Sequence, residues 1–197
     1  ASLRDQAADL SRAGFTTVGE LLVQDHDMPV MAALQAAGDL PIRLRWYEGT
    51  NHTLKPTGSA GDTDPMVRQV GLKLWVDGSP LEGKILSSEP FLDTKVTRDM
   101  GLTAPCCGSA NYTEEELLTI VRAYADSGLQ VACHVQGDAA TDRILNVYET
   151  VLRERNMIGT DHRCRLEHCG ETTKAQFERA NSLGVTCSMF VRHVYYF

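Results

Sequence analysis

The chain has 197 residues, a net charge of −7 and 43% hydrophobic residues, which are ordinary values for a globular domain or for part of a larger one. The acidic balance argues against a nucleic-acid surface, because such surfaces need clustered lysine and arginine. No apolar run approaches the roughly 18 residues that a membrane helix requires. We therefore expect neither nucleic acid nor a membrane among its partners.

Short β-rich runs alternate with amphipathic segments along most of the chain. Glycine repeatedly stands between a helical segment and the next β-rich run, where a left-handed backbone lets the chain reverse. The β-rich runs are dominated by Val, Ile, Leu and Thr, as in strands covered on both faces. The expected strands are residues 15–19, 41–47, 70–77, 129–135, 163–168 and 185–190.

Amphipathic helices fill most of the gaps between these strands. The helix expected at 113–128 opens with Thr113 and has Glu116 three residues later, which is a capping box. The helix expected at 172–184 is predicted to be capped by Thr172. Strands that alternate with helices indicate parallel β/α units with right-handed connections. The other expected helices are residues 28–38 and 138–156.

Two long loops, residues 50–65 and 78–112, each follow an expected strand and should lie over the carboxyl ends of the strands. Two α/β architectures fit this order of elements: a doubly wound open sheet and part of a (β/α)8 barrel. A doubly wound sheet usually has a glycine-rich nucleotide-binding turn, and the sequence contains no such motif. The positions of the polar residues decide between the two.

Three expected strands each offer one polar side chain near the carboxyl end. Strand residues alternate between two faces, so Lys73 and His134 are predicted to face inwards, opposite the apolar positions of their strands. In "RCRLEHCG", His168 is predicted to share the inner face with Leu166, while Glu167 points the other way. Barrel enzymes hold their catalytic groups at the carboxyl ends of the strands. This pattern favours a partial barrel with a metal site formed by the lysine and the two histidines.

Each of these residues also has a plain structural explanation. A single histidine at the end of a strand is more often held by ordinary hydrogen bonds than by a metal. Lys73 could form an ion pair with Asp77 on the same face, because a buried ammonium without a partner is costly. As a ligand the lysine would need chemical modification, since an ammonium group cannot bind a cation.

Three motifs occur in a distinctive order: a lysine followed by D-G, then H-x-x-G-D, then E-H, each at the end of an expected strand. In this order the sequence resembles the amidohydrolase superfamily, specifically the amidohydrolase family 3 branch that contains the N-substituted formamide deformylase-like proteins. The resemblance runs from about residue 10 to the end of the chain. The matching segments are "VGLKLWVDGS", "SSEPF", "YTEEELLTIVRAYADSGLQVACHVQGDAATDRIL", "RLEHCG" and "LGVTCSMFVRHVYYF".

The resemblance implies a (β/α)8 barrel with a small β-sandwich and one or two divalent metal ions, usually zinc, at the mouth of the barrel. By position, Lys73 matches a lysine that family members carboxylate with CO2, and His134 and His168 match metal ligands on the next two strands. The implied reaction is hydrolysis of an amide-type C–N bond in a small molecule, with metal-activated water and a general-base aspartate. The alternatives are hydrolysis of an ester or phosphoester on the same fold, and a fragment without catalytic activity.

The six expected strands match the second to seventh strands of such a barrel, so residues 1–197 are expected to form an incomplete hydrolase barrel domain. The first strand with its H-x-H pair is expected before Ala1, and the eighth strand with the aspartate beyond Phe197. This chain is therefore expected to be inactive alone. Residues expected to contact substrate or to orient the metal ligands are Asp77, Gln136, Asp138 and His193.

Two of these residues have equally simple alternatives. Asp138 could cap the helix that starts at Ala139, because aspartate is a favoured N-cap residue. His193 could be a structural histidine beside Tyr195 and Tyr196.

The six cysteines show no C-x-x-C spacing, and we interpret them as reduced thiols of a cytoplasmic protein. The sequence does not exclude secretion, because a signal peptide would lie upstream. The second and seventh barrel strands would be unpaired edges in this chain, and such edges favour pairing with another copy. We therefore expect a possible homo-oligomer formed through these edges.

Overall fold

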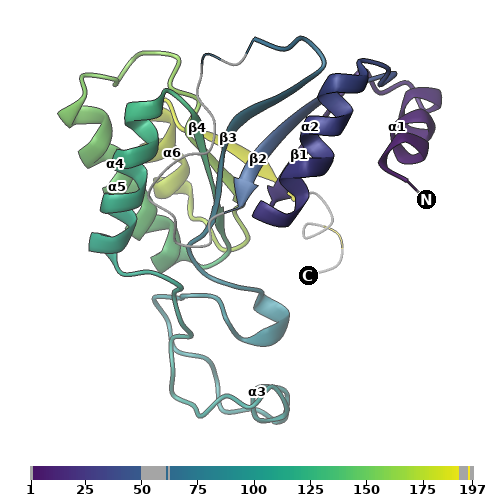
Figure 1. The fold of residues 1–197 in the computed structure, drawn as a ribbon. Helices are drawn as coiled ribbons and strands as arrows, with labels where there is room; N and C mark the ends of the chain where they lie inside the picture. Colours follow the sequence, from purple (N-terminus) through teal and green to yellow (C-terminus); the bar gives the residue numbers. More distant parts are fainter. Residues whose placement is uncertain (1, 50–60, 62, 191–194, 196–197) are drawn as a thin grey trace.

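The structure, a computed structural model, describes residues 2–49, 61, 63–190 and 195. Its six strands form one sheet in sequence order, and every neighbouring pair is parallel. The sheet curls into half of a barrel, with the helices connecting its strands (Figure 1). The expected partial (β/α)8 barrel is confirmed. A doubly wound sheet is excluded, because its strand order would reverse at a switch point.

The predicted alternation of strands and helices is present, and the bounds shift by a few residues. The strands are β1 (Thr17–Val23), β2 (Arg43–Gly49), β3 (Val67–Trp75), β4 (Gln130–Val135), β5 (Arg165–His168) and β6 (Thr186–Met189). The α-helices are α1 (Leu3–Arg12), α2 (Met28–Ala37), α3 (Lys95–Asp99), α4 (Glu114–Ser127), α5 (Asp138–Glu154) and α6 (Lys174–Leu183). Two short 3-10 helices are η1 (Asp25–Asp27) and η2 (Pro80–Glu82).

Local sequence sets the ends of α4 as predicted. The Thr113 hydroxyl accepts a hydrogen bond from the backbone N–H of Glu116, and the Glu116 carboxylate accepts one from the N–H of Thr113. This capping box satisfies two N–H groups that the first turn of a helix leaves without partners. The helix ends at Gly128, which has a φ of 73° that side-chain-bearing residues rarely adopt.

Two predicted caps are wrong by one residue. The cap of α6 is Thr173 rather than Thr172, because the Thr172 hydroxyl is hydrogen-bonded to a threonine of α5. The cap of α5 is Gly137, and Asp138 is the first residue of the helix. The alternative role of Asp138 as the N-cap of α5 is therefore wrong, and its carboxylate accepts a hydrogen bond from the backbone N–H of Ser88 at 2.7 Å.

Buried apolar side chains fill the space between the outer face of the sheet and the helices. One cluster joins β3, β4 and β5 to α4, α5 and α6, and a second joins β1, β2 and the start of β3 to α1 and α2. Val67 belongs to the second cluster, whereas Leu72 and Leu74 belong to the first. Val67 and Leu72 are five positions apart, so strict alternation would place them on opposite faces; the irregular register between β2 and β3 reverses the alternation between them. Beyond the irregularity, Lys73 alternates regularly with Leu72 and Leu74 and faces inwards.

The long segment between β3 and α4 extends away from the carboxyl ends of the strands and carries η2 and α3 (Figure 1). An antiparallel bridge between Leu86 and Gly108 closes its base. The segment therefore starts at the end of the sheet where the sequence predicted it, but it projects away from the sheet instead of lying over the strand ends. Most of the other predicted loop, residues 50–65, lies outside the described residues.

Two expectations from composition concern membranes and thiols. Over residues 2–49 and 63–190, no helix combines the length and the apolar character of a membrane span. All six cysteines are free, and those on β4, before β5 and after β5 are buried. This arrangement is compatible with the prediction of reduced thiols.

Candidate metal centre

The three predicted metal ligands lie on adjacent strands at the same end of the sheet. Lys73 is on β3, His134 is on β4, and His168 is the last residue of β5. In the sheet register, Lys73 is opposite Ala132, and His168 is opposite Val135, the neighbour of His134. The parallel register thus brings three residues that are far apart in the sequence to one rim.

The two histidines are in direct contact. Their ring centroids are 4.6 Å apart, with an angle of 66° between the ring planes. Nε2 of His134 lies 3.0 Å from the carbonyl oxygen of Gly78. A carbonyl oxygen can only accept, so this hydrogen bond places the proton on Nε2 and the lone pair on Nδ1. His134 can therefore offer Nδ1 to a metal ion while Nε2 holds the ring in place.

Strand alternation does not predict the orientation of the His168 side chain at this site. Leu166 lies in the outer apolar cluster, and Glu167 is buried with 4% exposure, so the two faces predicted for β5 are reversed. Simple alternation would then turn His168 outwards. Instead, His168 has a φ of 76° and Cys169 a φ of 56°. This left-handed turn re-aims the imidazole towards His134, so His168 lies on the predicted side of the sheet although the faces of β5 are reversed.

Lys73 is almost completely buried, with 2% exposure, and its Nζ has no hydrogen-bond partner among the described residues. Burial lowers the pKa of Lys73 to about 8, and the negative charge of Glu167 opposes this decrease. Nζ lies 5.3 Å from the centroid of the Trp75 ring, a cation–π distance. The lysine is therefore a desolvated amine that is neutral in a substantial fraction of molecules at mildly alkaline pH.

The predicted alternative, an ion pair between Lys73 and Asp77, is wrong for the described residues. The Asp77 carboxylate has 0% exposure and accepts hydrogen bonds from the backbone N–H groups of Leu86, Gln136 and Gly137 at 3.2, 3.0 and 2.8 Å. Burial raises the pKa of Asp77 to about 6, and the three N–H groups oppose that rise. Asp77 thus joins the loop after β3 to the turn between β4 and α5.

Asp77 also lies beside the imidazole pair. One of its carboxylate oxygens is 3.7 Å from Nε2 of His134. Gly137 has no room for a side chain here, because a Cβ would lie 1.9 Å from the carbonyl oxygen of Leu86. The carboxylate and the glycine together fix the loop that carries Gly78, the partner of His134.

The other predicted site residues are placed differently. Gln136 is buried, and its side-chain oxygen has no hydrogen-bond partner in the described part of the chain. The Asp138 carboxylate accepts hydrogen bonds from Ser88 and none from either imidazole. His193 lies outside the described residues.

Sequence reasoning missed a polar group on the inner face. The Glu167 carboxylate pairs with Arg165, and the guanidinium of Arg165 lies 5.3 Å from the centroid of the Tyr47 ring. Tyr47 donates a hydrogen bond to Gln130 at 2.7 Å. One signal could have found these residues: Leu166 is the apolar member of its strand, so its neighbours Arg165 and Glu167 should face inwards.

Comparison with known proteins agrees with this geometry. The sequence model of the Amidohydrolase family matches residues 1–197. The chain belongs to the amidohydrolase family. It is 31% identical over 124 residues to Protein LONG AFTER FAR-RED 3 of Arabidopsis thaliana, a match that covers 63% of this chain and 19% of that protein. It is 24% identical over 192 residues to N-substituted formamide deformylase of Arthrobacter pascens, covering 93% of this chain and 33% of that enzyme.

Solved structures give the same result for the fold. An uncharacterised metal-dependent hydrolase from Pyrococcus horikoshii OT3 matches with a TM-score of 0.69 and 26% identity over 94% of this chain and 35% of that one. A metal-dependent hydrolase from Pyrococcus furiosus matches in fold, with a TM-score of 0.69 and 24% identity over 94% of this chain and 36% of that one. This member of the amidohydrolase family therefore spans about a third, or less, of the length of the relatives and structures that it matches.

The donor set at the rim is consistent with a metal ion only if the lysine takes part. Among the residues that the structure describes, no three His, Cys, Asp or Glu side chains form a group that could hold a metal. His134 and His168 supply two imidazoles, and the Nζ of Lys73 is a buried polar atom in need of a partner. A carboxylated lysine would replace the buried amine by a planar carbamate and would add an anionic oxygen ligand.

Proposed function

We propose that this chain supplies part of the metal centre of a hydrolase that cleaves an amide-type C–N bond in a small molecule. The observation that carries the proposal is the desolvated amine of Lys73, without a hydrogen-bond partner in the described chain, at the same rim as two imidazoles in contact. A buried ammonium is costly unless it is neutralised or paired. Membership of the amidohydrolase family supports hydrolysis as the reaction class.

The amine of Lys73 is suited to carboxylation. Its lowered pKa, about 8, increases the share of the neutral nucleophile. The nitrogen lone pair attacks the carbon of CO2, a C–N bond forms, and one proton leaves the nitrogen for solvent. The product is a carbamate with one negative charge, which removes the buried positive charge and provides oxygen ligands for a hard cation.

In the proposed centre, Lys73 as its carbamate, His134 and His168 hold a divalent ion, which we propose to be zinc because imidazole and oxygen ligands suit it. The bound ion would polarise the substrate carbonyl as a Lewis acid. His134 presents Nδ1 because the Gly78 carbonyl accepts the proton of Nε2. Asp77 fixes the loop that carries this carbonyl.

The C–N bond is supported by the similarity to an N-substituted formamide deformylase. An ester or phosphoester substrate remains the alternative on the same fold, and an activity screen with matched amide, ester and phosphoester substrates separates them. We also propose that this chain alone is inactive, because none of its histidines forms an H-x-H pair and the described residues hold no strand after β6 that could supply a general-base aspartate. A turnover above background by residues 1–197 would contradict this second part.

Metal content tests the centre without relying on activity. The chain is equilibrated with zinc in bicarbonate buffer, dialysed and measured by elemental analysis. We expect about one zinc per chain, which is lost in Lys73→Ala, His134→Ala and His168→Ala. The control is His26→Ala, since His26 is an exposed histidine paired with Asp27. Equal zinc content in all four variants would contradict the proposed centre.

Carbamate formation has its own test. With 13C-labelled bicarbonate, we expect a carbamate carbon signal in the NMR spectrum that is absent in Lys73→Ala and present in Lys84→Ala, a substitution of an exposed lysine. Zinc binding without a carbamate signal would mean that the lysine is not a ligand in this form.

We further propose that the chain self-associates through its edge strands. β1 and β6 each pair with only one neighbour in the described sheet, and most of their side chains are exposed or half-buried. Unpaired parallel edges favour addition of another strand. Analytical ultracentrifugation over a hundredfold concentration range tests this proposal, and a monomer at every concentration would contradict it.

A cytoplasmic location is the simplest proposal for the compartment. The six free cysteines include Cys106 and Cys107, neither of which is fully buried. Exposed thiols persist most readily where the redox poise is reducing.

A further inference from the structure

Two thiols lie side by side behind the turn that carries His168. Cys169 follows His168 directly, and Cys187 lies on the neighbouring strand β6. Both side chains pack in the apolar cluster on the outer face of the sheet, and a side-chain hydrogen bond joins them. Both cysteines are free, so the two sulfur atoms are in contact without a covalent bond.

The two thiols differ in their access to solvent. Cys169 is 3% exposed, whereas Cys187 is half-buried. The hydrogen bond from Cys169 lowers the pKa of the Cys187 thiol, which favours Cys187 as the nucleophile. The Cys133 and Cys164 thiols are buried, and Cys133 also accepts a hydrogen bond from the Tyr148 hydroxyl at 3.1 Å. On the sheet, a small oxidant in solution therefore reaches Cys187 first and finds Cys169 beside it.

The turn that joins these thiols to the candidate metal centre has an unusual backbone. His168 has a φ of 76° and Cys169 a φ of 56°, in the left-handed region that residues with side chains rarely adopt. The N–H of Cys169 donates to the carbonyl of Val135 at 3.0 Å. Because Cys169 is covalently next to His168 in this turn, a displacement of Cys169 is passed directly to the imidazole.

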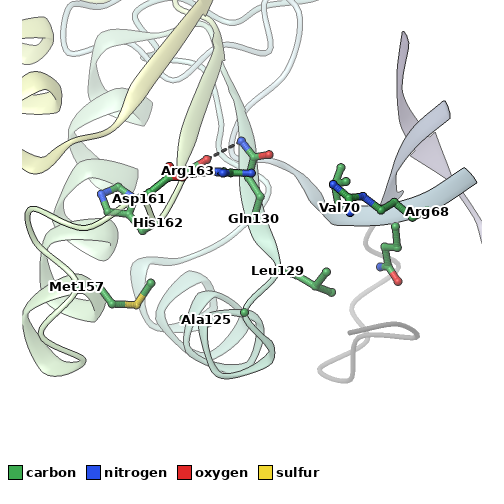
Figure 2. A pocket seen from close by; sticks show the side chains of 11 residues that line it. Arg68, Val70, Ala125, Leu129, Gln130, Met157, Asp161, His162 and Arg163 are labelled. Carbon is green, nitrogen blue, oxygen red and sulfur yellow. Dashed lines mark hydrogen bonds and ion pairs between the residues drawn. The ribbon is translucent and has the colours of Figure 1, made fainter. Parts of the chain in front are cut away.

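The opposite ends of the same strands are anchored. Gln130 of β4 donates a hydrogen bond to the carbonyl of Arg163 in the turn before β5 (Figure 2). In that turn His162 accepts a hydrogen bond from the N–H of Cys164 at 3.1 Å and donates one to the carbonyl of Leu183, shortly before β6, at 2.9 Å. The amino-terminal ends of β5 and β6 are thus fixed relative to one another. A closer approach at their carboxyl ends must be taken up by the turn at His168.

We propose that Cys169 and Cys187 form a reversible disulfide that separates His168 from His134 and weakens metal binding at the candidate centre. A disulfide holds its sulfur atoms about 2.05 Å apart and the two Cα atoms within about 4.4–6.8 Å, so bond formation draws Cys169 towards β6. This movement is away from His134, because β5 lies between β4 and β6. The bond itself does not depend on the proposed metal centre, whereas its effect on metal binding rests on that proposed function.

Hydrogen peroxide is a sufficient oxidant for this bond. The Cys187 sulfur attacks one peroxide oxygen, the O–O bond breaks, and a sulfenic acid and one water form. The Cys169 sulfur then attacks the sulfur of the sulfenic acid, the S–O bond breaks, and the disulfide and a second water form. The two thiols lose two electrons and two protons, and the peroxide is reduced to two molecules of water.

Peptide mapping of the 197-residue chain tests the bond. The reduced chain is treated with stoichiometric hydrogen peroxide, digested without reduction and analysed by mass spectrometry. We expect a cross-link between Cys169 and Cys187 that a phosphine reductant removes and that is absent in Cys187→Ser. The matched control Cys107→Ser removes an exposed thiol on the segment between β3 and α4, and it should leave the cross-link unchanged. Absence of this cross-link in the oxidised chain, or equal cross-linking of other cysteine pairs, would overturn the proposal.

Zinc binding tests the effect on the metal centre. The affinity of the chain for zinc in bicarbonate buffer is measured before and after oxidation. It should fall at least about tenfold in the wild-type chain, recover on reduction, and stay constant in Cys187→Ser. An unchanged affinity in the oxidised chain would overturn the coupling to His168. Weaker zinc binding by reduced Cys187→Ser would also overturn it, because the thiol would then be a metal ligand.

NMR spectra of the unmodified, metal-free chain separate a failure of this switch from a failure of the proposed centre. On oxidation, the Cβ signals of Cys169 and Cys187 should move to the range of disulfides, while that of Cys133 stays in the range of thiols. The imidazole signals of His168 should shift with them, and those of the exposed His26 should not. If the reduced chain binds no zinc, the proposed centre is contradicted, and unchanged His168 signals would overturn the switch.

Discussion

Replacing Lys73 by methionine should stabilise the metal-free chain at neutral pH. Burial lowers the pKa of Lys73 from 10.5 to about 8, and each pKa unit corresponds to about 1.36 kcal/mol. The folded chain is therefore destabilised by about 3 kcal/mol at pH 7 by the charged amine. Methionine has a similar length and no charge, so Lys73→Met should raise the free energy of unfolding by up to this amount.

The advantage of Lys73→Met should disappear as the pH rises. Below pH 8 the lysine is charged in both the folded and the unfolded chain, and the full penalty is present. Between about pH 8 and 10.5 the folded chain loses the proton while the unfolded chain keeps it, so the wild-type chain gains stability with rising pH. Above pH 10.5 the amine is neutral in both states, and the penalty is gone.

Urea unfolding in CO2-free buffer at several pH values measures this difference, because dissolved CO2 would allow the carbamate to form. Lys84→Met, a change at an exposed lysine that pairs with Glu82, is the control and should alter stability by less than about 0.5 kcal/mol. A Lys73→Met chain that is less stable than wild type at pH 7, or a difference that does not shrink with rising pH, would refute the reasoning.

Two further predictions concern packing and thiol reactivity. Gly137→Ala should lower the free energy of unfolding in urea by about 2–3 kcal/mol, because its Cβ would lie 1.9 Å from the Leu86 carbonyl oxygen. The control Gly19→Ala should be nearly neutral, because its Cβ would make only an ordinary contact at 3.8 Å. Equal effects of the two substitutions would contradict the close approach of Gly137 to Leu86. Burial raises the pKa of the Cys133 thiol to about 12, whereas Cys107 is exposed. Iodoacetamide at pH 8 should therefore label Cys107 at least a hundredfold faster than Cys133, as followed by mass spectrometry. Equal labelling rates in the folded chain would contradict the burial of Cys133.

The order of elements and much of the site could be predicted because they depend on local sequence. The capping box of Thr113 and Glu116 and the glycine after α4 mark both ends of that helix, whatever it packs against. Lys73 and His134 were assigned to the inner face correctly, since both lie in regular stretches of strand where side chains alternate strictly. The histidine at 168 was assigned to the correct rim, although the faces of its strand were reversed.

By itself, the sequence determined the alternation of strands and helices, the partial barrel, and the three residues at its rim. Only the tertiary structure decided how these side chains meet: a left-handed turn aims His168 at His134, the Lys73 amine is buried without a hydrogen-bond partner among the described residues, and backbone N–H groups rather than the lysine bind Asp77. The physical reason is the separation along the chain over which each effect acts. Periodicity and caps act over a few neighbouring residues, whereas the reversed faces of β5 and the desolvated amine of Lys73 depend on backbone geometry and on groups from distant parts of the chain.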